Sequence, residues 1–163
     1  MLGLPDGLSL RVALSDDREF LRRVYHSTRL AELSVTGWSV PQIEAFLEAQ
    51  FEAQDSHYRL HYPQAEFLIV LESARPIGRL YLMEYASELR VMDIALLTEQ
   101  RGQGFGRALM NAVLARADRA GQRVSLHVES ENFARTWYER LGFHNIEDRG
   151  VYQYMERPAI ALG

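Results

Sequence analysis

The chain has 163 residues, of which 47% are apolar, and it contains no cysteine. This length and apolar content predict a single domain over residues 1–163, with a core that needs no metal or disulfide. The lack of cysteine excludes disulfides, thiolate zinc sites and a cysteine acyl-enzyme, and it is compatible with a reducing compartment. A net charge of −4 argues against a nucleic-acid binder that relies on a broad basic face.

The first residues show no targeting signal. The apolar residues here have no basic flank before them and are interrupted by Pro5 and Gly7, so we expect no signal peptide. No apolar run in the chain is long enough to cross a membrane. A cytoplasmic protein without a membrane partner is therefore expected.

The chain is expected to open with a strand and a helix. Residues 8–14 alternate apolar and polar side chains, which is typical of a strand with one buried face. Ser15 and Asp16 follow as candidate N-caps for a helix over about residues 17–33. No repeat or linker interrupts this opening.

A second helix and three strands are predicted next. Pro41 suits the first turn of the helix, which is expected to reach about residue 59. Apolar runs at residues 66–72, 77–84 and 89–97 then predict three successive strands, with turn residues between the first two.

The last part of the chain alternates helices and strands. From Phe105 the apolar residues recur with a helical period, and Gly121 is a candidate cap at the end of that helix. The remaining predicted elements are a strand over residues 123–128, a short helix over 132–141, and strands over 143–147 and 151–156.

Three glycines join the predicted strand that ends near residue 97 to the helix that starts at Phe105. Gly102, Gly104 and Gly106 have no β-carbon, so the backbone can turn sharply and its N–H groups can approach an anion. A helix N-terminus adds unpaired N–H groups and a positive dipole end at the same place. These features favour a diphosphate ligand, and the alternative is a glycine-rich turn that binds nothing.

Two common phosphate motifs do not fit these glycines. A P-loop requires a lysine directly after its last glycine, and none follows here. A dinucleotide fingerprint requires a third glycine three residues after the second, where this sequence has Arg107 or Leu109.

The pattern Arg101-x-x-Gly104-x-Gly106 resembles the (Arg/Gln)-x-x-Gly-x-(Gly/Ala) motif of the GNAT superfamily, the acyl-CoA-dependent N-acyltransferases. The resemblance implies that this turn binds the pyrophosphate of coenzyme A and that the backbone of Leu96 pairs with the pantetheine arm. The implied cofactor-binding residues around the turn are Leu96, Thr98, Arg101, Gly102, Gln103, Gly104, Phe105, Gly106 and Arg107.

A second motif matches the same family further along the chain. Asn132-x-Ala134-x-x-x-Tyr138, followed by Gly142-Phe143, resembles the family pattern at the same spacing. The resemblance implies that Asn132 contacts coenzyme A and that Tyr138 is catalytic, protonating the departing thiolate. The residues alone, without the motif, favour a plain N-cap for Asn132 and a core tyrosine on one helix face for Tyr138.

The order of predicted elements also resembles that family. It implies an α/β fold, with a mixed, mostly antiparallel central sheet of about seven strands and helices on both faces. It implies an N-acetyltransferase that moves an acetyl group from acetyl-CoA to a primary amine by direct attack in a ternary complex. The alternative is a non-catalytic acyl-CoA-binding regulatory module.

The proton acceptor for the amine is the weakest part of the resemblance. Many family members place a glutamate on the strand before the turn, at positions that correspond to Arg90 and Met92. Neither residue accepts a proton at pH 7, so Asp93 and Glu84 are the remaining carboxylate candidates. We therefore expect a water-relayed proton path or an acceptor of low pKa, such as a peptide α-amine.

No metal is expected. His57 and His61 are four residues apart, but the sequence offers no third ligand near them. The acidic residues of the second predicted helix could attract a cationic amine, although such a stripe is usually only a solvated face. The expected partners are acetyl-CoA and an amine, and a homodimer is an open alternative.

Overall fold

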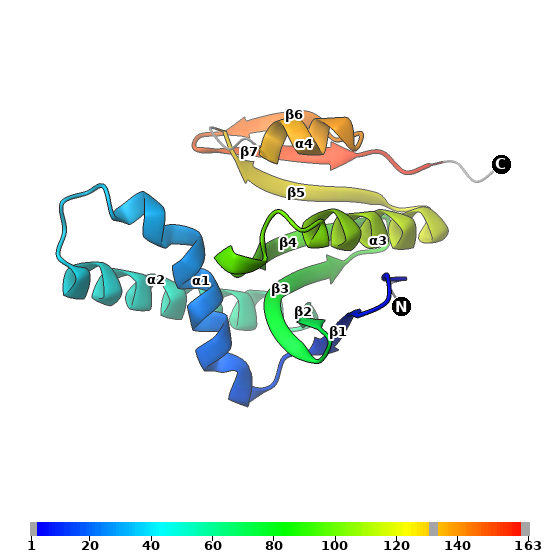
Figure 1. Cartoon of the computed structure of the whole chain (residues 1–163). Helices are drawn as coiled ribbons and strands as arrows, with labels where there is room; N and C mark the ends of the chain where they lie inside the picture. The colour runs from blue at the N-terminus through cyan, green and yellow to red at the C-terminus, as the bar shows by residue number, and fades with distance from the viewer. Residues whose placement is uncertain (1–2, 131–133, 161–163) are drawn as a thin grey trace. The chain divides into compact units, whose positions relative to one another are not determined.

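The computed structural model describes residues 3–130 and 134–160, and Figure 1 traces its helices and strands in chain order. The described part contains seven strands, four α-helices and two short 3-10 helices, η1 and η2. In order they are β1 (Leu8–Val12), η1 (Ser15–Asp17), α1 (Arg18–Leu33), α2 (Val40–His61), β2 (Glu66–Glu72), β3 (Arg75–Glu84), β4 (Glu88–Leu96), η2 (Thr98–Gln100), α3 (Phe105–Ala120), β5 (Arg123–Glu129), α4 (Ala134–Arg140), β6 (His144–Arg149) and β7 (Tyr152–Arg157).

The seven strands are hydrogen-bonded in the order β1-β2-β3-β4-β5-β7-β6. The pairs β1–β2, β5–β7 and β6–β7 are antiparallel, whereas β4 and β5 run parallel, from Glu88 opposite Arg123 to Val91 opposite Leu126. The expected α/β fold with a mixed, mostly antiparallel sheet of about seven strands is therefore confirmed.

The chain forms two compact units. One comprises Pro5–Tyr81 and Asp93–Arg107, and the other comprises Gly3 and Leu4, Leu82–Met92 and the described residues from Ala108 onward. We call them the α1–α2 unit and the β5–β7 unit after the elements that each contains whole. The strands β3 and β4 and the helix α3 each contribute residues to both.

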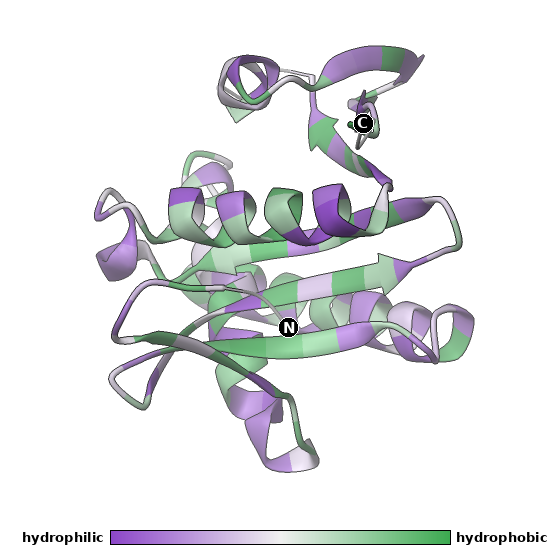
Figure 2. Ribbon diagram, turned by 90° about the vertical axis from the view of Figure 1, so that its right-hand side faces the viewer, coloured by the Kyte–Doolittle hydropathy of each residue, from purple (hydrophilic) through white to green (hydrophobic). Residues whose placement is uncertain are grey.

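Each unit has its own apolar core. Figure 2 shows long hydrophobic stretches along the central strands, while the helices alternate hydrophobic and hydrophilic residues. This alternation is typical of helices that bury one face. The fully buried residues of the α1–α2 unit include Leu47, Ile69, Ile77 and Leu80, and those of the β5–β7 unit include Leu82, Leu89, Leu109, Met110, Val113, Val124 and Met155.

The start of α1 differs from the sequence prediction. Ser15 and Asp16 do not cap the helix, because they lie in η1, and the residue preceding α1 is Asp17. The carboxylate of Asp17 instead accepts hydrogen bonds from both terminal nitrogens of Arg11 (2.7 and 2.9 Å) and from the Leu14 N–H (2.7 Å). The ion pair between Asp17 and Arg11 of β1 thus fixes the chain at the place where a helix cap was predicted.

The N-terminus of α2 carries a reciprocal cap that was not predicted. Ser39 Oγ accepts a hydrogen bond from the Gln42 N–H (3.3 Å), and Gln42 Oε1 accepts one from the Ser39 N–H (2.8 Å). Pro41 lies in the first turn, as predicted. This reciprocal pair satisfies two backbone donors that a helix end otherwise leaves unpaired.

Candidate active site

The glycine turn lies between η2 and α3 in the α1–α2 unit. Gly102 and Gly104 have φ angles of 76° and 87°, a region that side chains with a β-carbon adopt only at a cost. A β-carbon at Gly102, Gly104 or Gly106 would have no protein atom within 4 Å. Glycine is therefore required for conformation at Gly102 and Gly104, and the space above all three positions is open.

Two arginines flank this turn without a partner. Neither the Arg101 side chain nor the Arg107 side chain has a hydrogen bond or ion pair to any residue that the structure describes, and both are exposed. The chain has no lysine, so all 18 of its long-chain basic residues are arginines. Most of the others are paired with carboxylates, as Arg11 is with Asp17, so the two charges at the turn remain available for an anion.

The end of β4 leads directly into the turn. Leu97 N–H donates to the Ile77 carbonyl (2.9 Å), which fixes this end of β4 against β3. Gly78 allows the close approach, because a β-carbon there would lie 2.7 Å from Leu96 Cδ2 and closer still to the Ala95 carbonyl oxygen. The predicted cofactor residues from Leu96 and Thr98 to Arg107 thus lie in one unit, on one continuous stretch of chain.

Tyr138 lies on α4 in the β5–β7 unit. Its side chain is buried, and its ring packs against Trp137 (5.0 Å between centroids) and Phe143 (5.6 Å). The predicted helix face is present, since Thr136, Glu139 and Arg140 are exposed. Asn132 lies outside the described residues.

The two carboxylates considered as proton acceptors are both engaged. Asp93 accepts a hydrogen bond from Arg79, which is only 2% exposed and also donates to Gln54 Oε1 (2.9 Å). Glu84 accepts a hydrogen bond from Gln122 Nε2 (3.2 Å) and lies 3.7 Å from Arg116. The pairing of Asp93 with the buried Arg79 gives this carboxylate a structural role.

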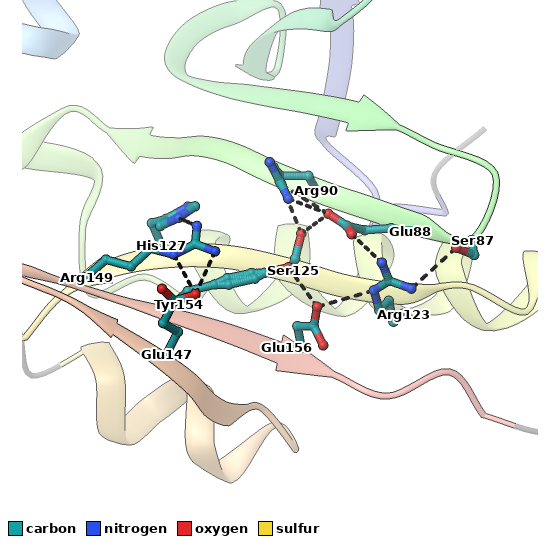
Figure 3. A network of polar contacts seen from close by, with 10 residues as sticks. All are labelled: Ser87, Glu88, Arg90, Arg123, Ser125, His127, Glu147, Arg149, Tyr154 and Glu156. Atoms are coloured by element: carbon teal, nitrogen blue, oxygen red, sulfur yellow. Dashed lines mark hydrogen bonds and ion pairs between the residues drawn. The ribbon is translucent and has the colours of Figure 1, made fainter.

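A polar network that was not predicted from the sequence joins β4, β5 and β7 (Figure 3). The carboxylate of Glu88 accepts hydrogen bonds from Ser125 Oγ (2.5 Å), Arg90 Nε (3.1 Å) and Arg123 Nη2 (2.8 Å). Burial alone would raise the pKa of Glu88, but these donors lower it below its ordinary value. The alternation of polar residues at 88 and 90, and at 125 and 127, was the available signal.

The same network contains a tyrosine close to two cations. Tyr154 has Arg149 over one side of its ring (4.4 Å) and Arg90 nearby (5.8 Å), and its hydroxyl donates to Glu156 (2.7 Å). Burial raises the pKa of Tyr154, so its hydroxyl stays protonated. His127 packs edge-on against the same ring, 5.1 Å away.

Comparison with known proteins assigns the family. A family model described as an acetyltransferase (GNAT) domain matches residues 32–155. The chain belongs to the GNAT family. This confirms the resemblance drawn from the glycine turn and the α4 motif, and with it the expectation of an acetyltransferase domain.

Individual relatives agree with this assignment. The chain is 30% identical over 86 residues to a ribosomal protein bS18-alanine N-acetyltransferase of Haemophilus influenzae, a stretch that covers 52% of this chain and 59% of that relative. The N-acetyltransferase PaiA of Thermoplasma acidophilum, solved with coenzyme A, has a TM-score of 0.71 at 18% identity, covering 93% of this chain and 98% of that one. An acetyltransferase of Thermus thermophilus has a TM-score of 0.67 at 20% identity, covering 93% and 96%. The two structures show that the GNAT fold is shared.

Two further findings concern membrane-spanning helices and metal sites. In residues 3–130 and 134–160, no helix combines the length and the apolar character needed to cross a membrane. Within the same residues, no three His, Cys, Asp or Glu side chains gather as a metal site. That the protein needs no metal stays a prediction.

Proposed function

We propose that this GNAT chain transfers the acetyl group of acetyl-CoA directly to a primary amine in a ternary complex. The observation that carries the proposal is the turn at Gly102 and Gly104, which directly precedes α3. It is flanked by Arg101 and Arg107, whose side chains have no partner among the described residues. Backbone N–H groups at a helix N-terminus bind phosphate, and guanidinium groups pair with its remaining charge. The pyrophosphate of coenzyme A is the ligand we assign to Arg101–Arg107, with Leu96 and Thr98 along its pantetheine arm.

Tyr138 is the group we propose as general acid. A phenol with a pKa near 10 can deliver a proton to a thiolate leaving group as the thioester breaks. Nothing in the chain offers a cysteine nucleophile, so the amine attacks the thioester carbon itself. The Haemophilus relative acts on the alanine of a ribosomal protein, and a peptide α-amine is therefore the first acceptor we propose.

An acceptor screen tests this function. Purified protein is mixed with acetyl-CoA and one amine at a time, and release of free thiol is measured. The panel holds a synthetic hexapeptide with N-terminal alanine, the same peptide acetylated at its N-terminus, spermidine and an aminoglycoside. We expect thiol release with the free hexapeptide and none with its acetylated control.

The initial-rate pattern distinguishes direct transfer from a mechanism with an acetyl-enzyme. Direct transfer predicts intersecting lines when acetyl-CoA and acceptor are varied together, and no acetylated enzyme by mass spectrometry. Parallel lines, together with an acetyl adduct that amine removes, would contradict direct transfer. Tight acetyl-CoA binding without thiol release for any amine would favour the non-catalytic acyl-CoA-binding module.

A further inference from the structure

One face of the β5–β7 unit carries charged and polar side chains from four strands (Figure 3). Ser125 lies opposite Glu156 and His127 opposite Tyr154 in the β5–β7 register. The other face of β7 meets α3, because Arg157 pairs with Asp118 of that helix at 2.7 Å. Successive residues of a strand point to opposite faces, so Tyr154 and Glu156 point away from α3.

Nearly every group on this polar face is already committed. Glu88 accepts hydrogen bonds from Ser125, Arg90 and Arg123, and Glu156 accepts one from Tyr154. Glu147 accepts two from Arg149 (3.1 and 3.0 Å). Arginine keeps its proton at any relevant pH. Among the residues drawn in Figure 3, His127 is therefore the group whose neutral form can take up a proton near pH 7.

The lone pair of His127 has a defined position. Its Nε2 lies 2.8 Å from Nη1 of Arg149. A guanidinium can only donate, so Nε2 is the acceptor and the neutral ring carries its hydrogen on Nδ1. Arg149 is held independently by Glu147 through Nε and Nη2, so Nη1 can leave without releasing the side chain. A cationic N–H donor thus already occupies the place that an ammonium N–H would take.

The position of His127 also suits a proton acceptor, because β4 has no carboxylate at Arg90 or Met92. The last β4–β5 pair is Val91 with Leu126, and His127 is the next residue of β5, as Met92 is the next residue of β4. The side chain of His127 is exposed and points to the same face as Arg90, since Arg90 lies opposite Ser125. An imidazole on β5 thus follows the last β4–β5 pair, on the same face as Arg90, where β4 lacks a proton acceptor.

We propose that His127 is the general base that deprotonates the acceptor amine, an inference that rests on the proposed acetyl transfer. The ammonium displaces Nη1 of Arg149 from Nε2. One ammonium N–H bond breaks, its electron pair stays on nitrogen for attack on the thioester carbon, and the proton forms a new bond to Nε2. The resulting imidazolium then loses this proton to water.

The charges around the imidazole favour its neutral resting form. Burial lowers the pKa of His127, and so do Arg149 from β6 and Arg90 from β4, while Glu147 from β6 raises it. Tyr154 of β7 faces the ring as an uncharged phenol. The base is therefore ready at neutral pH and is lost only in acid.

The test is the pH profile of kcat at saturating acetyl-CoA and saturating acceptor, using the best acceptor of the panel above. Wild type should lose activity in acid with a midpoint below about 6.5, the ordinary pKa of histidine. His127→Gln should remove this limb and lower kcat by about 10²- to 10⁴-fold, the usual effect of a general base. His144→Gln, an exposed histidine of β6, is the matched control and should behave as wild type.

Two variants of Arg149 distinguish a catalytic role of His127 from a structural one. Arg149→Gln should keep the acidic limb but move it to higher pH, because the guanidinium lowers the pKa of His127. Arg149→Lys should leave it near the wild-type position. NMR titration of the His127 imidazole in the same proteins reports its pKa without any acceptor. A His127→Gln protein with the wild-type kcat and limb would overturn the proposal, whereas a wild type that acetylates nothing would contradict the proposed function instead.

Discussion

Arg79 and Asp93 form an ion pair inside the α1–α2 unit, with Arg79 only 2% exposed. The guanidinium is enclosed by the rings of Tyr81 (4.9 Å) and Tyr25 (5.9 Å). A buried charge of this kind is stable only while its partner remains charged. The carboxylate next to the β4 segment of the proposed site is thus a structural group.

Removing that carboxylate should destabilise the fold. We expect Asp93→Asn to lower the free energy of unfolding by about 3–5 kcal/mol, because it leaves the Arg79 charge buried and uncompensated. Urea denaturation followed by circular dichroism measures the change. The double variant Arg79→Met/Asp93→Leu should recover most of the loss. An Asp93→Asn protein of wild-type stability whose activity alone has vanished would instead identify Asp93 as the base.

The glycine turn predicts a specific loss of cofactor binding. Gly104→Val should cost about 1–3 kcal/mol in backbone strain and weaken acetyl-CoA binding roughly tenfold or more by calorimetry. Gly37→Val is a matched control, because Gly37 also has a positive φ (81°) and a β-carbon added there would meet no atom within 4 Å. It should lose similar stability and keep its acetyl-CoA affinity. Equal affinity in both variants would remove the turn from the site.

Tyr138→Phe distinguishes catalysis from packing. The ring contacts with Trp137 and Phe143 persist in phenylalanine, so folding and acetyl-CoA affinity should change little. Loss of the general acid should lower kcat by about 10²- to 10⁴-fold. Tyr152→Phe, at an exposed tyrosine of β7, is the control. A Tyr138→Phe variant as fast as wild type would make Tyr138 a core residue only.

Asp17 should make the α1–α2 unit acid-sensitive. Its hydrogen bonds with Arg11 lower its pKa to about 2, against a usual value near 3.9 in an unfolded chain. A depressed folded-state pKa contributes stability that is present above the unfolded pKa and is lost as pH falls toward the folded one. Thermal melts between about pH 5 and pH 2 should therefore fall less steeply for Asp17→Asn than for wild type. Parallel curves would show that the pair with Arg11 contributes nothing.

Local patterns predicted the fold and the turn well. The glycine spacing located the start of α3, and apolar periodicity gave the element order, because both depend on residues close in sequence. The partner of Asp93 was not predictable, since Arg79 belongs to another strand. His127 escaped notice for the same reason: its significance depends on Arg149, Tyr154 and Met92, which only strand pairing brings to one face. The roles predicted for Asn132, Tyr138 and the residues of the turn stay predictions.

Because all of its long-chain basic residues are arginines, the enzyme is a poor target for acetylation of its own side chains. Guanidinium groups stay protonated and do not attack thioesters, whereas lysine ε-amines do. The chain therefore offers no side-chain amine for self-acetylation, even at the acetyl-CoA concentrations of a long assay. Amine-reactive dyes in such an assay would report on the acceptor and leave the enzyme's side chains unlabelled.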